Sequence, residues 1–245
     1  MSTLAIIGGT GLSQIDGLQI VEKKQLNTPF GSPSADFIMG QIHDQQVVFL
    51  ARHGNPHVIP PHKINYRANI WGLKELGVKQ IIAVAAVGGI TQTMHPSRIV
   101  IPKQIIDYSF GREHSFFSDH LEHVVHIDFT TPYADKLRTK LIAAGKQLQL
   151  DVFTGGVYGC TQGPRLETAA EIIRMDRDGC DLVGMTGMPE AALARELDLD
   201  YATCAVVANW AAGKSEGIIT MSDIELNLKK GMVNIARLLG QVISA

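Results

Sequence analysis

Short runs of apolar, often β-branched residues recur along the chain and alternate with segments whose apolar positions have helical spacing. The apolar runs predict strands, and several of them lack polar alternation, as strands buried on both faces do. The predicted strands cover residues 4–8, 35–39, 46–51, 80–87, 98–106, 152–160, 181–185 and 201–208. The predicted helices cover residues 65–76, 133–148, 166–178, 189–196 and 223–243.

Strands that alternate with helices predict an α/β fold, with a mixed, largely parallel sheet covered by helices on both faces in a three-layer α/β/α arrangement. No linker, low-complexity stretch or internal repeat divides the 245 residues, so we expect a single domain over residues 1–245. In such sheets, ligands bind at the carboxyl ends of the strands. The candidate chemistry described below falls at these ends.

Charge and hydropathy exclude several kinds of partner. The formal net charge is -2, so the chain lacks the broad positive field that holds a nucleic acid backbone. The longest apolar run, from Ile81 to Val87, is much shorter than the roughly 18 to 20 residues of a membrane span. The first residues lack the basic segment of a signal peptide and lead directly into a predicted strand. We therefore expect a cytoplasmic protein that binds neither nucleic acid nor membranes.

Cysteine and histidine usage gives no indication of a metal. Cys160, Cys180 and Cys204 are odd in number and lack C-x-x-C spacing, so we expect them to be buried as small apolar residues. None of the nine histidines forms a recognised ligand pair. We expect no metal and no other cofactor.

A glycine-rich turn, Gly8–Gly11, follows the first predicted strand. Such a turn can present backbone N–H groups and the Thr10 hydroxyl to an anion, although it can equally be a plain strand-ending turn. It matches neither the dinucleotide-binding G-x-G-x-x-G pattern nor a Walker sequence, and residues 12–17 do not predict the helix that a dinucleotide site needs.

Arg52 and His53 follow the third predicted strand, where a guanidinium and an imidazole have little structural reason to be. Arginine suits bidentate contact with phosphate, but it can also pair with a carboxylate that holds a loop. Farther along, Glu167 is predicted in the first turn of a helix, where the helix dipole alone favours a carboxylate. His57 and His62 flank a Pro-Pro turn and are expected to be loop or interface residues.

Six segments occur in a fixed order along the whole chain: I-I-G-G-T-G-L, A-R-H-G, P-P-H-K-I-N-Y-R-A-N, G-P-R-L-E-T, G-M-T-G-M-P-E and V-V-A-N-W-A-A-G-K. Together they resemble the purine nucleoside phosphorylase and methylthioadenosine phosphorylase family of trimeric type. The resemblance implies an enzyme, a pentosyltransferase that cleaves a purine nucleoside with inorganic phosphate as co-substrate.

The same resemblance implies where phosphate and ribose bind. Met185 matches a methionine that lies against the ribose. At the Ala85-Ala86 turn many relatives carry a hydroxyl or amide, so in this chain only backbone N–H groups can contribute there. The implied phosphate-binding residues are Thr10, Arg52, His53, Ala86 and Thr186.

The base pocket matches Glu167 and the segment Asn209-Trp210-Ala211. Methylthioadenosine phosphorylases usually carry a small hydroxyl residue at the first position, and an Asp at the positions of Asn209 and Ala211. A neutral amide cannot supply a proton to N7, but it can hydrogen-bond N7 and a 6-oxo group, while the carboxylate accepts from the N1–H of a 6-oxopurine. Adenine lacks that N1–H, so Glu167 is expected to disfavour 6-aminopurines.

The sugar end of the site is expected to be apolar. Residues 217–222 are largely apolar where relatives that use ordinary ribose tend to carry a polar side chain, and Met221 matches the hydrophobic residue that contacts a 5′-methylthio group. A 6-oxopurine site combined with an apolar 5′ site suggests reversible phosphorolysis of S-methyl-5′-thioinosine to hypoxanthine and 5-methylthioribose 1-phosphate, a purine salvage reaction.

The expected mechanism is direct displacement at C1′ without a covalent enzyme intermediate. His53 and Asn209 are the expected catalytic residues, acting on the phosphate and on the departing base. His126 matches a residue that relatives contribute across a subunit boundary, so a homotrimer is expected with its active sites near the interfaces.

Three alternatives to this function remain open. Two are a methylthioadenosine phosphorylase and a general inosine/guanosine phosphorylase. The third, from a different class, is a nucleotide-binding oxidoreductase or a non-catalytic nucleotide-binding module built on the Gly8–Gly11 turn.

Asn209→Asp is expected to shift substrate preference toward 6-aminopurines, because a carboxyl group can hold the proton that N7 takes on departure. The measurement is the relative rate of base release from methylthioadenosine and methylthioinosine. Unchanged relative rates would show that the base is selected elsewhere.

Overall fold

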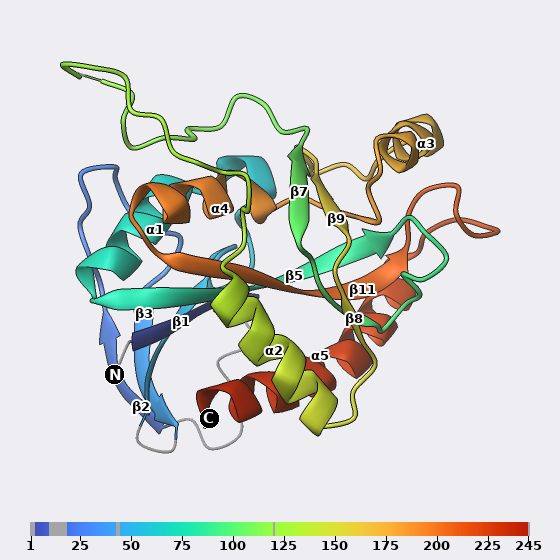
Figure 1. Cartoon of the computed structure of the whole chain (residues 1–245), viewed down its shortest axis with the longest axis horizontal. Coiled ribbons are helices and arrows are strands. Elements are labelled where there is room, and N and C mark those ends of the chain that lie inside the picture. The colour runs from blue at the N-terminus through green and yellow to red at the C-terminus, as the bar shows by residue number, and fades with distance from the viewer. Residues whose placement is uncertain (1–2, 10–18, 43–44, 120, 245) are drawn as a thin grey trace.

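Two long strands run in parallel through the centre of the computed structural model, β5 (Val78–Gly89) and β11 (Asp200–Trp210) (Figure 1). The structure describes residues 3–9, 19–42, 45–119 and 121–244. Nearly every residue of β11 is buried, and so is most of β5. Strands covered on both faces carry continuous apolar sequence, which explains why both were predicted without polar alternation.

The remaining strands extend this central pair into a mixed sheet of eleven strands within the described residues. On one side of β5 lie, in order, β1 (Thr3–Gly8), β4 (Gln45–Ala51), β3 (Phe37–Ile42) and β2 (Gln19–Lys24). Farther along the same side of β5, β10 (Leu182–Gly184) pairs with its last residues and is followed by β9 (Val157–Cys160) and β7 (Gln104–Asp107), whereas β11 occupies the other side. Beyond β11 lie β6 (Ile99–Ile101) and β8 (Val152–Thr154). The inner pairs are mostly parallel, whereas β2, β3 and β4 pair antiparallel.

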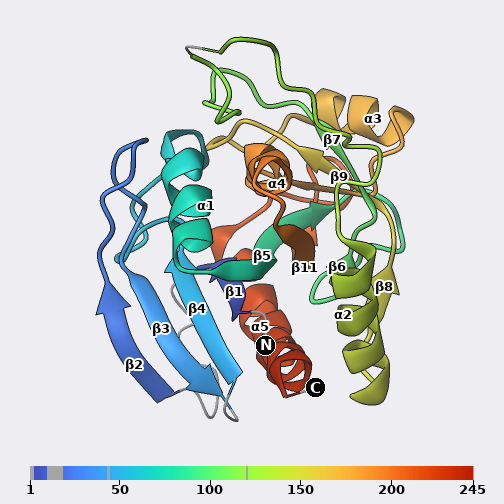
Figure 2. The same cartoon turned by 60° about the vertical axis from the view of Figure 1, so that its left-hand side comes forward.

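Helices cover both faces of the sheet, which gives the predicted three-layer α/β/α arrangement (Figures 1 and 2). One face carries α1 (Tyr66–Glu75) and α4 (Gly187–Glu196). The opposite face carries α2 (Asp135–Gln147) and α5 (Met221–Ile243), while α3 (Ala169–Arg177) lies at the periphery. In the ranges that the structure describes, none of the helices combines the length and the apolar character needed to cross a bilayer.

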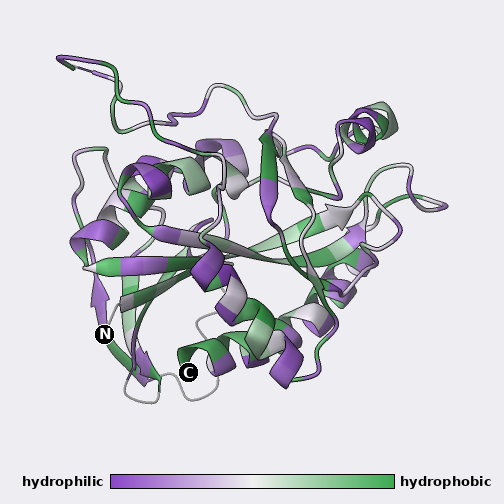
Figure 3. Ribbon diagram, viewed as in Figure 1, coloured by the Kyte–Doolittle hydropathy of each residue, from purple (hydrophilic) through white to green (hydrophobic). Residues whose placement is uncertain are grey.

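Alternate residues of β1 enter different cores. Ala5 and Ile7 pack with α1 and α4, whereas Ile6 packs with α2 and α5. All three side chains are fully buried. Figure 3 shows the hydrophobic character of β1 and of much of β5. Each Å² of apolar surface buried stabilises the fold by about 25 cal/mol, and these strands bury apolar surface on both faces. They therefore form a rigid support for the residues at their carboxyl ends.

Two predicted strands are each divided in the structure, and one strand was not predicted. The predicted strand 98–106 is β6 and β7, separated at Pro102, which has no N–H for the ladder. The predicted strand 152–160 is β8 and β9, separated at Gly155 and Gly156, whose φ values are 125° and 87°. β2 is exposed along its whole length, so its sequence carries no signal of a buried face.

Capping side chains explain two of the helix starts that differ from the prediction. The last helix begins at Met221 rather than 223, because the Thr220 side chain accepts from the backbone N–H of Asp223. α3 begins at Ala169, where Thr168 and Glu171 form a capping box. Residues 166–168 therefore precede the helix instead of forming its first turn.

The three cysteines are free and buried, as predicted. Burial raises the pKa of Cys160 and of Cys204 to about 12, so both thiols stay protonated at neutral pH. Among the residues that the structure describes, no group of three or more His, Cys, Asp or Glu side chains is placed to hold a metal ion.

Two glycines of α5 give a matched test of packing against β11. A Cβ added at Gly231 would overlap Cγ2 of Val206, which is fully buried, whereas a Cβ at Gly240 would meet no atom within 4 Å. We expect Gly231→Ala to lower the free energy of unfolding by about 1–3 kcal/mol through overpacking. Gly240→Ala should raise it by about 0.5–1 kcal/mol through helix propensity. Urea denaturation measures both, and equal effects would contradict the close approach of α5 to β11.

Candidate functional site

A cavity of about 450 Å³ lies at the carboxyl ends of the central strands, with its outer wall on α5. Such positions collect ligands in sheets of this kind, and the volume fits a nucleoside-sized molecule. The strand ends contribute polar and small residues, namely Gly9, Arg52, His53, Ala86, Thr186 and Asn209.

The cavity opens where one side of β5 has no neighbouring strand. β1 pairs with β5 up to Ala83, and β10 begins its pairing only at Gly88. Ala86 lies in this gap and is exposed although the flanking residues of β5 are buried. The resemblance implied a turn at Ala85-Ala86, whereas the structure places both residues inside β5, in agreement with the predicted strand 80–87. The small alanine side chain leaves space beside the backbone.

Arg52 is held by a buried ion pair on the floor of the cavity. Its Nε and Nη2 donate to the two carboxylate oxygens of Glu190, at 2.6 and 2.8 Å, and its Nη1 donates to the carbonyl oxygen of Val84 at 3.1 Å. Glu190 is fully buried and also accepts from the Tyr201 hydroxyl at 2.9 Å. Burial alone would lower the pKa of Arg52, but the Glu190 carboxylate more than offsets it, so the guanidinium stays charged.

The structure confirms the carboxylate pair that the sequence left open for Arg52, and contact with phosphate stays a prediction. The arginine forms a carboxylate pair that fixes the loop after β4, and the same guanidinium lines the cavity. Three of its five N–H groups donate to Glu190 and Val84, so the remaining two are the ones able to contact an anion.

His53 is held as a neutral imidazole. Its Nδ1 lies 2.8 Å from the carbonyl oxygen of Ile59, and because a carbonyl only accepts, Nδ1 carries the hydrogen. The ring stacks on His57 with 4.3 Å between centroids, and both rings line the cavity. Burial, followed by the charge of Arg52, lowers the pKa of His53 to about 4. Nε2 is then a hydrogen-bond acceptor at neutral pH.

Met185 and Thr186 follow β10 and line the cavity beside the gap in the sheet. Thr186 immediately precedes α4 and its side chain makes no capping hydrogen bond. Met188 has extended backbone angles (φ -122°, ψ 140°), so the regular helix begins at Pro189, where the sequence predicted its start. Met185 and Thr186 therefore lie at the carboxyl end of a strand, where the sequence analysis predicted ligand binding.

Glu167 reaches the cavity from the segment before α3. Its Oε1 accepts a hydrogen bond from the Thr161 hydroxyl at 2.6 Å, shorter than the 3.3 Å from that hydroxyl to the Gly184 carbonyl oxygen. Because Glu167 lies outside the helix, a preference for negative charge in a first helical turn does not explain it. Thr161 thus fixes one carboxylate oxygen, and Oε2 is the oxygen that can accept from a ligand.

Asn209 is placed by a bulge in β11. Val207 pairs with Val87 and Asn209 with Gly88, so Ala208 is an extra residue in the ladder. The Asn209 amide lines the cavity and donates from Nδ2 to the carbonyl oxygen of Trp210 at 2.7 Å. Ala211 lines the cavity too, whereas Trp210, expected to contact substrate, does not.

The apolar wall of the cavity differs from the one predicted. Met221 was expected there, but it is the first residue of α5, 66% exposed, and lies outside the lining. The wall is formed by four other apolar residues, namely Ile219, Ile224, Leu228 and Met232. The last three are spaced by four, so they share one face of α5. In the sequence this spacing is indistinguishable from a core-facing helix.

Thr10 and His126 were also predicted to contribute to the site. Thr10 lies outside the described residues, although Gly9 before it lines the cavity. His126 is exposed and does not line the cavity of its own chain.

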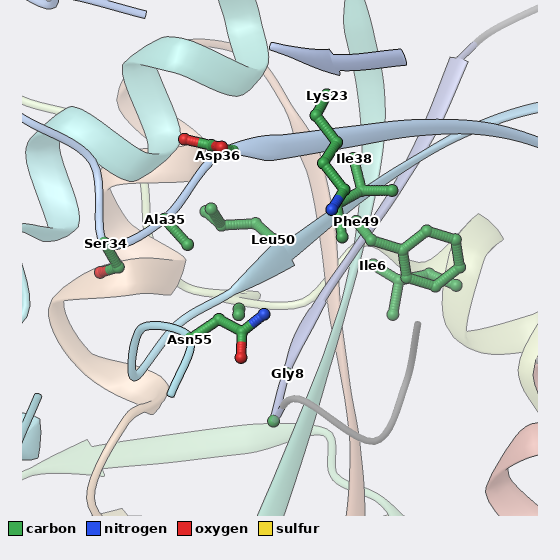
Figure 4. Close-up of a pocket in the computed structure, with 12 residues that line it drawn as sticks. Ile6, Gly8, Lys23, Ser34, Ala35, Asp36, Ile38, Phe49, Leu50 and Asn55 are labelled. Atoms are coloured by element: carbon green, nitrogen blue, oxygen red, sulfur yellow. The ribbon is translucent and has the colours of Figure 1, made fainter. Parts of the chain in front are cut away.

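A second hollow of about 210 Å³ adjoins the first at Gly9 and is also lined by Gly8 (Figure 4). Lys23, Asp36 and Asn55 lie on its walls among apolar residues. It borders Gly9, the last described residue before position 19, so we assign no ligand to it.

Comparison with known proteins gives consistent matches over the whole chain. The family model described as "Phosphorylase superfamily" matches residues 3–244. A protein of Pseudomonas syringae pv. tomato, named probable S-methyl-5′-thioinosine phosphorylase, is 55% identical over 245 residues, covering 100% of both chains. A 6-oxopurine nucleoside phosphorylase of Pyrococcus furiosus is 45% identical over 244 residues, covering 98% of this chain and 91% of that one. The solved structure of methylthioadenosine phosphorylase from Schistosoma mansoni in complex with adenine has a TM-score of 0.94 and 31% identity, covering 100% of this chain and 91% of the other.

The lowered pKa of His53 predicts a dependence of stability on pH. An unfolded imidazole has a pKa of about 6.5, so between pH 6.5 and 4 the unfolded chain binds a proton at this position that the folded chain does not. This contribution is complete above pH 6.5 and is lost as the pH falls toward 4. We expect His53→Gln to flatten the fall in the free energy of unfolding over this range, measured by urea denaturation. The exposed His123→Gln is the control, and equal slopes for wild type and His53→Gln would contradict the prediction.

Proposed function

Because the chain belongs to the phosphorylase superfamily, we propose that this cavity binds a purine nucleoside with inorganic phosphate and catalyses the reversible phosphorolysis of S-methyl-5′-thioinosine. One observation carries the proposal: a carboxylate and an amide suited to a 6-oxopurine share a cavity with an apolar helix face. The products are hypoxanthine and 5-methylthioribose 1-phosphate.

Glu167 and Asn209 support the choice of a 6-oxopurine. Oε2 of Glu167 is able to accept from the N1–H of hypoxanthine, and the Asn209 amide is able to hydrogen-bond N7 and the 6-oxo group. Adenine has no N1–H, so it would leave this carboxylate oxygen without a donor. The bond from Thr161 holds the carboxylate in place, which sharpens the discrimination because Glu167 cannot easily turn away.

The helix face formed by Ile224, Leu228 and Met232 supports a methylthio substituent. A 5′-hydroxyl buried against this face would lose its hydrogen bonds to water, at a cost of about 1–3 kcal/mol. A methyl group there gains about 0.8 kcal/mol from burial. Both effects favour the 5′-methylthio group over the hydroxyl of ordinary ribose.

Arg52, His53 and Thr186 support phosphate binding below the anomeric carbon. A phosphate oxygen attacks C1′ as the C1′–N9 bond breaks, and the electron pair of that bond passes to the purine. The proton that hydrogen phosphate loses balances the one that hypoxanthine gains. No covalent enzyme intermediate is required, and the contribution of the protein is positioning and charge stabilisation.

Two related activities are the rivals. The first rival is phosphorolysis of ordinary 6-oxopurine nucleosides, the activity for which the Pyrococcus furiosus relative is named. It uses the same class of base, but the apolar wall of the cavity favours a 5′-methylthio group over a 5′-hydroxyl. The neighbouring solved structure is a methylthioadenosine phosphorylase, and the Glu167–Asn209 pair argues against adenine in this chain.

A homotrimer belongs to the same proposal. His126 is exposed and is not among the residues that line the cavity of its own chain, which leaves it available for contact with the 5′ end of a substrate in a second copy.

Release of base from methylthioinosine, inosine and methylthioadenosine tests the proposal, with and without phosphate. We expect phosphate-dependent cleavage, with kcat/KM for methylthioinosine about tenfold or more above that for inosine, as one buried hydroxyl without a partner implies. Preference for inosine would refute the sugar assignment. Preference for methylthioadenosine would refute the roles of Glu167 and Asn209.

Two leucines of α5 provide a matched pair for the same assay. Leu228 lines the cavity, whereas Leu226 lies outside the lining and is 53% exposed. Leu228→Asn should lower kcat/KM for methylthioinosine much more than for inosine, and Leu226→Asn should change neither.

A further inference from the structure

We propose that Arg112 is a positioning residue of the reaction, which holds the base-facing and sugar-facing segments of the cavity in a fixed relation. The proposal rests on the function proposed above. Arg112 follows β7 in the chain and does not line the cavity, so it acts through the residues it contacts. Its side chain is buried, with 8% exposed.

One side of the guanidinium holds the segment that presents Glu167. Nη2 of Arg112 donates to the carbonyl oxygens of Thr161 and Gln162, at 3.0 and 2.9 Å, and Nε donates to Oε1 of Gln162 at 3.1 Å. Thr161 in turn donates its hydroxyl hydrogen bond to Glu167. Arg112 therefore fixes the backbone from which the base-recognising carboxylate is oriented.

The other side holds the segments beside the sugar. Nη1 donates to the carbonyl oxygens of Met185, at 3.0 Å, and Met188. It also donates to the Tyr66 hydroxyl at 3.2 Å, and that hydroxyl donates to the carbonyl oxygen of Pro61 at 3.0 Å. Met185 and Pro61 both line the cavity. A single side chain thus joins three cavity segments that are far apart in sequence.

The chemistry of these contacts requires a guanidinium. Among the described residues, no Asp or Glu forms an ion pair with Arg112, and its acceptors are all neutral carbonyl, amide or hydroxyl oxygens. The guanidinium has five N–H groups in a rigid plane for six acceptor atoms, so the two N–H groups of Nη1 are shared among three of these acceptors. A lysine ammonium has three donors on one atom and cannot span both sides.

The segments also touch one another, so a shift of one displaces the others. A Cβ at Gly163 would lie 2.5 Å from Sδ of Met185 and 3.4 Å from Cγ of Pro61. Because these segments are closely packed, loss of the Arg112 hydrogen bonds to one segment is expected to displace the neighbouring cavity segments as well.

Arg112→Lys tests the proposal, with Arg138→Lys as the matched control. Arg138 is partly buried, with 15% of its side chain exposed, and donates to the backbone carbonyl of Pro102 at 2.9 Å, but it lies on α2 outside the cavity. For Arg112→Lys we expect kcat/KM for the nucleoside to fall about 100-fold, the effect of a displacement near 1 Å. The ratio of kcat/KM for a 6-oxopurine nucleoside to kcat/KM for a 6-aminopurine nucleoside should fall. The Kd of hypoxanthine, measured by calorimetry, should rise. The control should keep all three values.

The outcomes distinguish a failure of the Arg112 proposal from a failure of the proposed function. The assay uses whichever nucleoside the wild type cleaves best, so a preference for inosine would refute the methylthio assignment and still measure Arg112. A folded Arg112→Lys enzyme with kcat/KM, base preference and hypoxanthine affinity all within about threefold of wild type would overturn the positioning role, since a 1 Å displacement predicts about 100-fold. A wild type that neither cleaves a nucleoside nor binds hypoxanthine would overturn both.

If Arg112→Lys does not unfold cooperatively, Tyr66→Phe provides the second variant. It removes only the hydroxyl that links Arg112 to Pro61 and keeps the ring shape. We expect a smaller loss, of about three- to tenfold in kcat/KM, with a higher KM for the nucleoside and a nearly unchanged KM for phosphate, as one neutral hydrogen bond implies. Wild-type constants for Tyr66→Phe would then overturn the proposal.

Discussion

Ten residue pairs join β11 to β5 in parallel, and helices pack on both faces of the two strands. The positions of the other site elements follow from this pairing. β1 and β10 add to β5 on its other side but leave residues 84–87 between them, which opens the cavity. A single extra residue, Ala208, changes the register just before Asn209 and brings its amide into that space. A slip of the pairing by one residue would send every inward side chain of β11 to the opposite face.

Two buried guanidinium groups show different ways to stabilise a charge away from water. Arg52 faces the carboxylate of Glu190, so most of its charge is compensated within the protein. Arg112 has only neutral acceptors among the described residues, and its charge is spread over several carbonyl dipoles. The first arrangement fixes one side chain at the bottom of a cavity, and the second fixes backbone segments relative to one another. Removal of either arginine would leave buried acceptors without donors, a cost of about 1–3 kcal/mol each.

The sequence predicted the layers of the fold and most of the polar site because both follow from local patterns. Arg52, Thr186 and Asn209 stand at the ends of apolar strands, and parallel strand ends meet at one edge of a sheet. The rest depends on tertiary structure. No local pattern marks Ala208 as a bulge, and no periodic signal surrounds Arg112 in its irregular segment. Met221 was proposed from the resemblance alone, and the cavity-facing residues of α5 were not identified because a cavity-facing helix and a core-facing helix have the same apolar spacing.

The apolar wall is formed mainly by one face of α5, whereas the polar residues that line the cavity stand at strand ends and in the segment before α3. These two parts of the site are built on different layers of the molecule. Replacement of a side chain on that helix face changes the shape available to a 5′ substituent without touching the strand register on which the chemistry depends. Substrate range in this scaffold can therefore diverge by a few substitutions in α5, with the reaction itself inherited unchanged.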